Sequence, residues 1–89
     1  MNGSRLAELR DTLLALYECA RALEAPEVAY HALYGACHAA EQLHDLDTLA
    51  LIREHARREA AGDFGEIAAR CESAQQKGRP RAPFQGATG

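Results

Sequence analysis

Apolar residues recur along the first quarter of the chain in steps of three and four, the spacing of one face of an α-helix. This pattern predicts a helix over residues 4–24. Its stripe consists of Leu6, Leu9, Leu13, Leu16, Ala20 and Leu23, and it is widened by Leu14 and Tyr17. The stripe holds more apolar surface than one neighbouring helix can cover, so we expect part of it to meet a partner.

A second helix is predicted over residues 26–43, because proline fits the first turn of a helix but not its interior. The two sides of this segment differ in character. One side is a polar stripe of Glu27, His31, Tyr34, His38, Glu41 and Asp45. The other is nearly all small and consists of Val28, Ala29, Ala32, Gly35, Ala36, Ala39 and Ala40, closed by Leu43. Small side chains let backbones approach closely, so we expect this helix to pack between two others.

The pattern predicts two further helices, over residues 46–61 and 64–77. The helix over residues 46–61 begins after Asp45 or Asp47, either of which is a suitable N-cap. Its expected inward residues are Leu46, Leu49, Ala50, Ile52, Ala56 and Ala60, and its expected outward residues are Arg53, His55, Arg57 and Arg58. The second is shorter, with a narrow apolar face of Phe64, Ile67, Cys71 and Ala74.

No segment alternates in the manner of a β-strand, and residues 79–89 show no periodicity. We therefore expect an all-α fold, an antiparallel bundle or hairpin array of three main helices and a short fourth. The single domain covers residues 1–78, and residues 79–89 form a disordered C-terminal tail.

The predicted helix starts recur about every 18–19 residues, so that two helices make a hairpin of about 36 residues, close to the period of helical repeat arrays. The segment from Gly62 to Ala74 resembles the turn and second helix of a tetratricopeptide repeat. That family places a Gly-acidic-aromatic turn before small residues at set helical positions, and the matching residues here are Gly62, Asp63, Phe64 and Ala74.

The resemblance covers about a third of the chain, and three positions depart from it. Ile67 stands where the family has Ala, and Glu54 and His55 stand where it has Leu and Gly. The resemblance implies a tetratricopeptide-like or α-solenoid-like architecture and a protein-binding surface.

Composition narrows the class of protein. With 89 residues, 47% hydrophobic and 26% charged at a net charge of −3, the chain is one small domain rather than a multidomain enzyme or a disordered acidic chain. No apolar run approaches the ~18 residues of a membrane helix, so no membrane partner is expected. Nine of the ten basic residues are Arg, which is typical of a GC-rich genome and favours a bacterial source.

The three cysteines are an odd number and are widely spaced along apolar stripes. We interpret Cys19, Cys37 and Cys71 as free, buried thiols of a cytoplasmic protein. Burial in apolar surroundings raises the pKa of a thiol and weakens it as a nucleophile. The chain also has no Gly-rich phosphate loop, so we expect no enzymatic activity.

A metal site is the sharpest chemical alternative. Glu41 and His44 have the Glu-x-x-His spacing that occurs twice in di-iron bundles, but this chain has it once. We expect no metal or other cofactor, with His38, Glu41 and His44 as the alternative ligand set. The side chains of His31, Tyr34, His38 and Glu41 form either a partner or ligand surface or simply the wet face of an amphipathic helix.

The basic residues Arg53, Arg57 and Arg58 could contact phosphates. Glu54 and Glu59 interleave with them and no aromatic residue accompanies them, which weighs against nucleic acid as a partner.

The sequence favours a non-enzymatic protein–protein interaction module or small adaptor that binds a protein partner or a second copy of itself. We expect self-association through the first helix, on a face of Leu6, Leu9, Leu13, Leu14, Leu16 and Tyr17. The alternative is a small metal- or ligand-binding helical bundle that uses the His/Glu stripe of the second helix.

Overall fold

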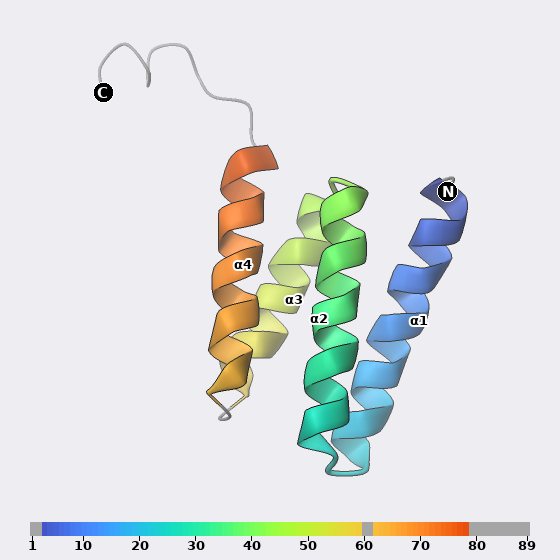
Figure 1. Ribbon diagram of the computed structural model, residues 1–89, viewed down its shortest axis with the longest axis vertical. Helices are drawn as coiled ribbons and strands as arrows, with labels where there is room; N and C mark the ends of the chain where they lie inside the picture. The colour runs from blue at the N-terminus through green and yellow to red at the C-terminus, as the bar shows by residue number, and fades with distance from the viewer. Residues whose placement is uncertain (1–2, 60–61, 79–89) are drawn as a thin grey trace.

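The computed structural model describes residues 3–59 and 62–78, which form four α-helices and no strand. The helices are α1 (Gly3–Ala22), α2 (Pro26–Gln42), α3 (Leu46–Arg58) and α4 (Asp63–Gly78), shown in Figure 1. The predicted all-α fold is confirmed. The expected tail over residues 79–89 and the expected inward residue Ala60 lie outside the described residues.

Two predicted helix ends are wrong by a few residues. The first helix ends at Ala22 rather than 24, and the third ends at Arg58 rather than 61. In the first case the reason is local, because Glu24 adopts the left-handed backbone conformation with φ of 56°. The amide of Ala25 then donates to the carbonyl of Ala20 at 2.9 Å, which closes a Schellman-type helix end.

The turn between α2 and α3 repeats this geometry. His44 has φ of 53°, and the amide of Asp45 donates to the carbonyl of Ala40 at 2.9 Å. Neither residue at the left-handed position is glycine, and each therefore holds a conformation that L-residues rarely adopt. The two turns reverse the chain within three residues each and place consecutive helices side by side.

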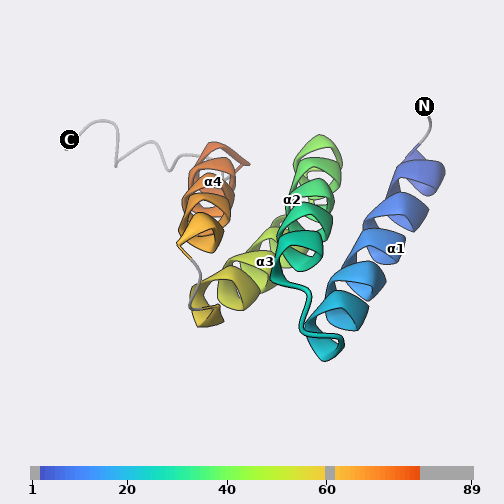
Figure 2. The same ribbon diagram turned by 60° about the horizontal axis from the view of Figure 1, so that its bottom comes forward.

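The helices pair as hairpins, α1 with α2 and α3 with α4, and α2 also packs on α3 and α4. Figure 2 shows α2 between α1 on one side and α3 and α4 on the other. Among the described residues the backbones of α1 and α3 do not approach each other closely. The expectation that the second helix is packed between others is therefore confirmed.

The small side of α2 allows this packing. Its buried members are Ala29, Ala32, Ala36, Ala39 and Ala40. A Cβ atom added to Gly35 would lie 3.2 Å from the nearest methyl carbon of Leu13 on α1, so any larger residue here would require Leu13 to move by a few tenths of an ångström. Val28 is the exception to the prediction, because its side chain is exposed.

The core lies between α2 and its neighbours. Its largest fully buried side chains are those of Tyr17, Phe64, Leu33, Leu49, Ile52 and Ile67. Inward residues predicted for the third and fourth helices, Leu49, Ile52, Ala56, Phe64, Ile67 and Cys71, are buried as expected.

Helices α2 and α4 present core residues at matching positions. Cys37 and Cys71 are 34 residues apart and face each other. The same separation relates Tyr30 to Phe64, Leu33 to Ile67 and Ala40 to Ala74, which all belong to the core or pack against it. The two hairpins therefore use their second helices in the same way. No helix among the described residues has both the length and the apolar character needed to cross a bilayer.

Candidate functional site

The structure divides the predicted self-association face between the core and the surface. Tyr17 is fully buried, and Leu13 and Leu14 pack against the core. Leu6 is half-buried. Leu9 and Leu16 are 46% and 50% exposed. The six residues therefore do not form one open face, because they extend over too much of the helix circumference.

Tyr17 is turned inward by a polar contact as well as by packing. Its hydroxyl donates to Oε2 of Glu59 at 2.6 Å, and Nε of Arg21 lies 2.9 Å from the same oxygen. Burial raises the pKa of the Tyr17 hydroxyl well above its usual value, and the hydrogen bond to the Glu59 carboxylate raises it further. Tyr17 is therefore a neutral donor that attaches α1 to the end of α3.

The exposed leucines of α1 form a regular row. Leu23, in the turn after α1, is 74% exposed and continues the seven-residue spacing of Leu9 and Leu16. Thr12 and Cys19 are also exposed and lie between these leucines, in steps of three and four. We call Leu9, Thr12, Leu16, Cys19 and Leu23 the outer seam. Cys19 was predicted to be buried, and that prediction is wrong.

The outer seam faces away from α3. Leu9 and Leu16 directly precede Arg10 and Tyr17, whose side chains reach Asp45 and Glu59 at the two ends of α3. Successive helical residues diverge by about 100°, so the leucines point to a different side of α1. Its leucines are exposed on that side and, among the described residues, no other helix covers them.

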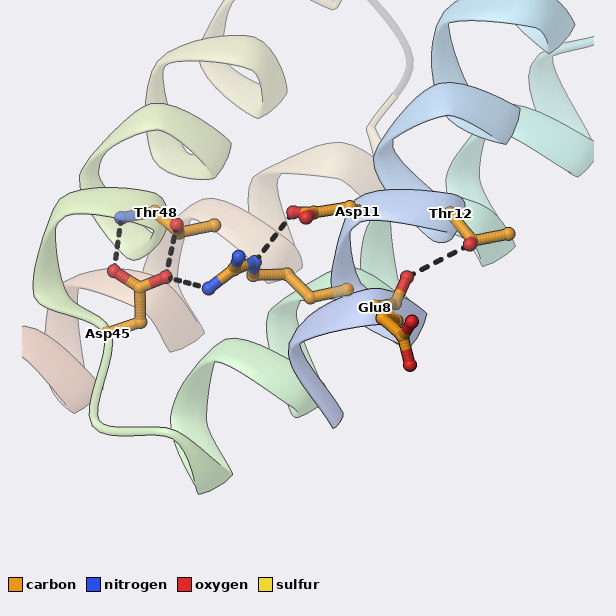
Figure 3. A network of polar contacts seen from close by, with 6 residues as sticks. Glu8, Asp11, Thr12, Asp45 and Thr48 are labelled. Atoms are coloured by element: carbon orange, nitrogen blue, oxygen red, sulfur yellow. Dashed lines mark hydrogen bonds and ion pairs between the residues drawn. The ribbon is translucent and has the colours of Figure 1, made fainter. Parts of the chain in front are cut away.

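Arg10 links α1 to the N-terminus of α3 through Asp45, which is labelled in Figure 3 together with Asp11 and Thr48. Its Nη1 lies 2.7 Å from Oδ2 of Asp45, and its Nε lies 2.9 Å from Oδ1 of Asp11. Asp45 is the N-cap of α3 and accepts from the amide of Thr48 at 3.1 Å and from the Thr48 hydroxyl. Of the two predicted caps, Asp45 is the correct one.

The polar stripe of α2 is partly covered by α4. Tyr34 stacks on His38, with ring centroids 4.8 Å apart, and the guanidinium of Arg70 lies 5.8 Å from the centre of the Tyr34 ring. Nε of Arg70 donates to Oε1 of Glu41 at 3.0 Å. His31 remains exposed at the edge of the neighbouring Tyr30 ring. Tyr34 is half-buried rather than openly exposed, so this stripe offers a narrower surface than a free helix face.

The alternative metal ligands do not converge. Nδ1 of His38 lies 3.7 Å from Oε1 of Glu41, but that carboxylate is already paired with Arg70. His44 lies in the turn after α2. Within residues 3–59 and 62–78, no three His, Cys, Asp or Glu side chains are grouped so that they could hold a metal ion. Glu41 and His44 instead line an open cleft of about 560 Å³ together with Arg70 and Lys77.

The basic cluster predicted on the third helix is also split. Arg57 and Arg58 are exposed, but Arg53 and His55 are partly buried, so their predicted outward position is wrong. His55 packs edge-on against the Tyr17 ring, with centroids 5.2 Å apart. Nε of Arg53 and Nδ1 of His55 are buried without a hydrogen-bond partner in the described part of the chain. These two residues flank the inward-facing Ile52 and Ala56 and are drawn into the interface with them.

Cys37 and Cys71 are fully buried, as predicted, and their sulfur atoms lie 3.4 Å apart. The hydrogen bond between the two thiols lowers the pKa of Cys37 against the opposing effect of burial, and raises that of Cys71 together with burial. Arg70 favours the thiolate of Cys37, and Arg53 favours that of Cys71. Each sulfur therefore has an arginine nearby that favours its thiolate.

None of the protein-family models, curated proteins or solved structures compared with this chain matches it. The function proposed below therefore rests on the residues of this chain and on their arrangement.

Sequence reasoning missed the roles of two residues that hold the helices together, Leu33 and Glu59. Leu33 is fully buried and was not assigned to the core, although its spacing to Tyr30 and Cys37 fits one helical face. Glu59 was treated only as a charge among the arginines. Its partners lie some forty residues away in sequence, and no local pattern identifies such a contact.

Proposed function

We propose that this protein is a non-enzymatic interaction module that pairs with a second copy of itself through the outer seam of α1. The observation that carries the proposal is the row of exposed leucines at seven-residue spacing on a helix whose other side is packed. The bacterial and cytoplasmic setting expected from the sequence belongs to the same proposal.

The spacing of the seam supports a helix as the occupant. Apolar residues repeated every seven positions, with smaller residues halfway between, are the pattern by which one helix packs along another. A second α1 carries the identical row, so that two copies related by a two-fold axis would bury both rows at once. Two such rows match each other in length and character, and this is why we commit to a second copy rather than another protein.

The seam is short, so the dimer is expected to be weak. Burying the rest of a half-exposed leucine contributes about 1 kcal/mol, and six leucines meet in the dimer. Association itself costs at least about 4 kcal/mol in lost translational and rotational freedom. The difference of about 2 kcal/mol corresponds to a dissociation constant on the order of tens of millimolar, so we expect the dimer only at millimolar concentrations of the chain.

Replacing Leu16 with Glu tests the proposal, because it places a charge at the centre of the seam without disturbing the core. We expect the unaltered chain to sediment as a monomer–dimer mixture at several millimolar, and L16E as a monomer at the same concentration. The matched control is Leu51→Glu on α3, because Leu51 is 48% exposed, nearly the same as Leu16. An unaltered chain that stays monomeric, or an L51E chain that dissociates as L16E does, would contradict the proposal.

Cys19 reports the direction of pairing. In a parallel dimer the two Cys19 side chains oppose each other across the seam, whereas in an antiparallel dimer centred on Leu16 each opposes Thr12. A disulfide-linked dimer that forms quickly under mild oxidation therefore indicates the parallel arrangement.

The repeat architecture is the second part of the proposal. The 34-residue separation of matching core positions in α2 and α4 equals the period of tetratricopeptide repeats. It supports an array of two similar hairpins, in which α1 is the terminal helix. A terminal helix with an apolar outer side is where such an array would be completed by a neighbour.

A further inference from the structure

Cys37 and Cys71 bring two thiols into direct contact across the interface between α2 and α4. Their sulfur atoms lie 3.4 Å apart, and neither side chain has any solvent exposure. A disulfide bond is about 2.05 Å long, so the sulfurs need to move together by only a little over 1 Å. The two cysteines occupy matching positions in the two hairpins, and this contact is therefore a consequence of how the hairpins stack.

An arginine side chain lies near each sulfur of the pair. Either thiol can donate to the other, and the guanidinium of Arg70 favours a thiolate at Cys37. Arg53 is close enough to Cys71 to favour its ionisation, while Glu41 opposes ionisation at both sulfurs. A thiolate beside a second thiol is the arrangement in which one cysteine reacts and the other resolves the product.

We propose that Cys37 and Cys71 form a reversible disulfide when the protein meets a peroxide, and that this bond links the two helical hairpins covalently. The Cys37 thiolate attacks one peroxide oxygen, the O–O bond breaks, and the other oxygen of hydrogen peroxide leaves as water once it is protonated. The sulfur of Cys71 then attacks the sulfenic sulfur of Cys37, the S–O bond breaks, and a second water leaves. In sum, two thiols and one peroxide give one disulfide and two waters.

Burial controls how fast this reaction proceeds. Peroxide reaches the sulfurs only when α4 separates from α2, which is a local opening rather than global unfolding. Helix α4 packs mainly on α3 and less on α2, so the sulfurs lie at the smaller of its two interfaces. The bond would then prevent this opening, and the oxidised chain would be the more rigid form.

The experiment uses the full chain with Cys19→Ser, which removes the exposed thiol, at a low micromolar concentration of protein. After exposure to hydrogen peroxide under native conditions, we expect the intact mass to fall by two hydrogens, and both thiols to be unreactive toward iodoacetamide when the oxidised chain is then denatured. Helical circular dichroism should be unchanged, and Tm should rise by more than about 10 °C because the bond closes a loop of about 34 residues. A dithiol reductant should restore the original mass and Tm.

The matched control is the same chain with Cys71→Ser in addition, which keeps the attacking sulfur and removes the resolving one. It should gain oxygen atoms rather than lose hydrogens, and its Tm should not rise. The proposal is overturned if the two-thiol chain also gains oxygen without forming the bond, or if the disulfide form has lost helical signal. Should Cys71→Ser fail to fold, Cys37→Ala serves as the control, because it must yield no disulfide and no rise in Tm.

Discussion

Asp45 uses one carboxylate for two different contacts. One oxygen accepts from the amide of Thr48 and caps α3, and the other receives the guanidinium of Arg10 from α1. Burial alone would raise the pKa of this carboxyl, but the hydrogen bonds from Thr48 and the charge of Arg10 outweigh it and lower the pKa. The ionised form is therefore preferred in the folded chain.

Asp45→Asn separates the two contacts, since asparagine is a good N-cap but carries no charge for Arg10. We expect D45N to lose about 0.5–1.5 kcal/mol of unfolding free energy at neutral pH, and Asp45→Ala about 1–3 kcal/mol, because alanine also removes the cap. Asp47→Asn is the control, since Asp47 lies exposed in the same first turn, and it should change stability by less than about 0.5 kcal/mol. Urea denaturation measures all three.

The same variant has a defined pH signature. Because the folded pKa of Asp45 lies below the unfolded value of about 3.9, its contribution is fully present above that pH and is lost as the pH falls through the folded pKa. The difference in stability between the unaltered chain and D45N should therefore shrink as the pH drops below about 4. A difference that stays constant down to about pH 2 would show that Asp45 is not preferentially ionised in the folded state.

Residues of this kind differ in how well sequence predicts them. Asp45 was predicted as a cap because capping is local and depends on a residue three positions away. Glu59 was not predicted to hold Tyr17, because the two are 42 residues apart and only the tertiary fold joins them. Tyr34 fell between these cases, since its position on the polar stripe was evident but its cover by Arg70 was not.

At the scale of the helix, close contact between α1 and α2 depends on Gly35. A Cβ atom at this position would meet the two methyl groups of Leu13 at 3.2 and 3.3 Å, closer than side chains normally pack. Gly65 in α4 is the natural comparison, because a Cβ atom added there meets nothing within 4 Å. A side chain is therefore crowded at Gly35 and has open space at Gly65.

Valine at each glycine tests this difference. We expect Gly35→Val to destabilise the fold by about 1–3 kcal/mol, because the branched side chain pushes α1 away from α2. Gly65→Val should be neutral or slightly stabilising, because glycine is the poorer helix former and the position is open. Thermal unfolding of both variants gives the comparison. Equal changes in stability at the two positions would mean that crowding against Leu13 does not set the cost of a side chain at Gly35.

The periodicity of apolar residues predicted the four helices well, but it predicted less well which side chains are exposed on them. The four segments and the small side of α2 followed from spacing alone, because burial on one side of a helix produces that spacing. Cys19 was misplaced because it adjoins Ala20 in sequence, and the two residues diverge by about 100° around α1. Ala20 is buried and Cys19 is exposed, so the broad apolar stripe of α1 serves both the core and the outer seam.

At the scale of the whole molecule, α2 is the helix on which α1, α3 and α4 all pack. Backbone packing within the described residues joins α1 to α2 alone, yet several side-chain contacts run from α1 to α3 and to the residues that flank it. Arg10 reaches Asp45 before α3, and Tyr17 and Arg21 reach Glu59 after it. These contacts, together with the packing of His55 on the Tyr17 ring, hold α1 beside both ends of α3 and so help to set the angle between the hairpins.

A double-mutant cycle on Tyr17 and Glu59 measures the second contact. Tyr17→Phe should lose about 1 kcal/mol of unfolding free energy, and Glu59→Ala about 1.5–2.5 kcal/mol, because alanine leaves the buried Tyr17 hydroxyl without its acceptor. The double variant should lose about 1 kcal/mol less unfolding free energy than the sum of the two single losses. The reason is that phenylalanine has no hydroxyl that Glu59→Ala could leave unpaired.

Glu54→Ala is the control for the loss of a negative charge, because Glu54 is an exposed residue of α3, the helix that Glu59 follows. This variant should show no coupling to Tyr17→Phe. Hydrogen exchange adds a local measure. The unaltered chain and E59A are compared at temperatures equally far below their own unfolding midpoints. The amides of α1 should then exchange faster in E59A than in the unaltered chain, because α1 depends on this contact to stay against the end of α3. The amides of α4 should exchange at the same rate in both chains. Additive losses and uniform exchange would instead mean that α2 alone holds α1 in place.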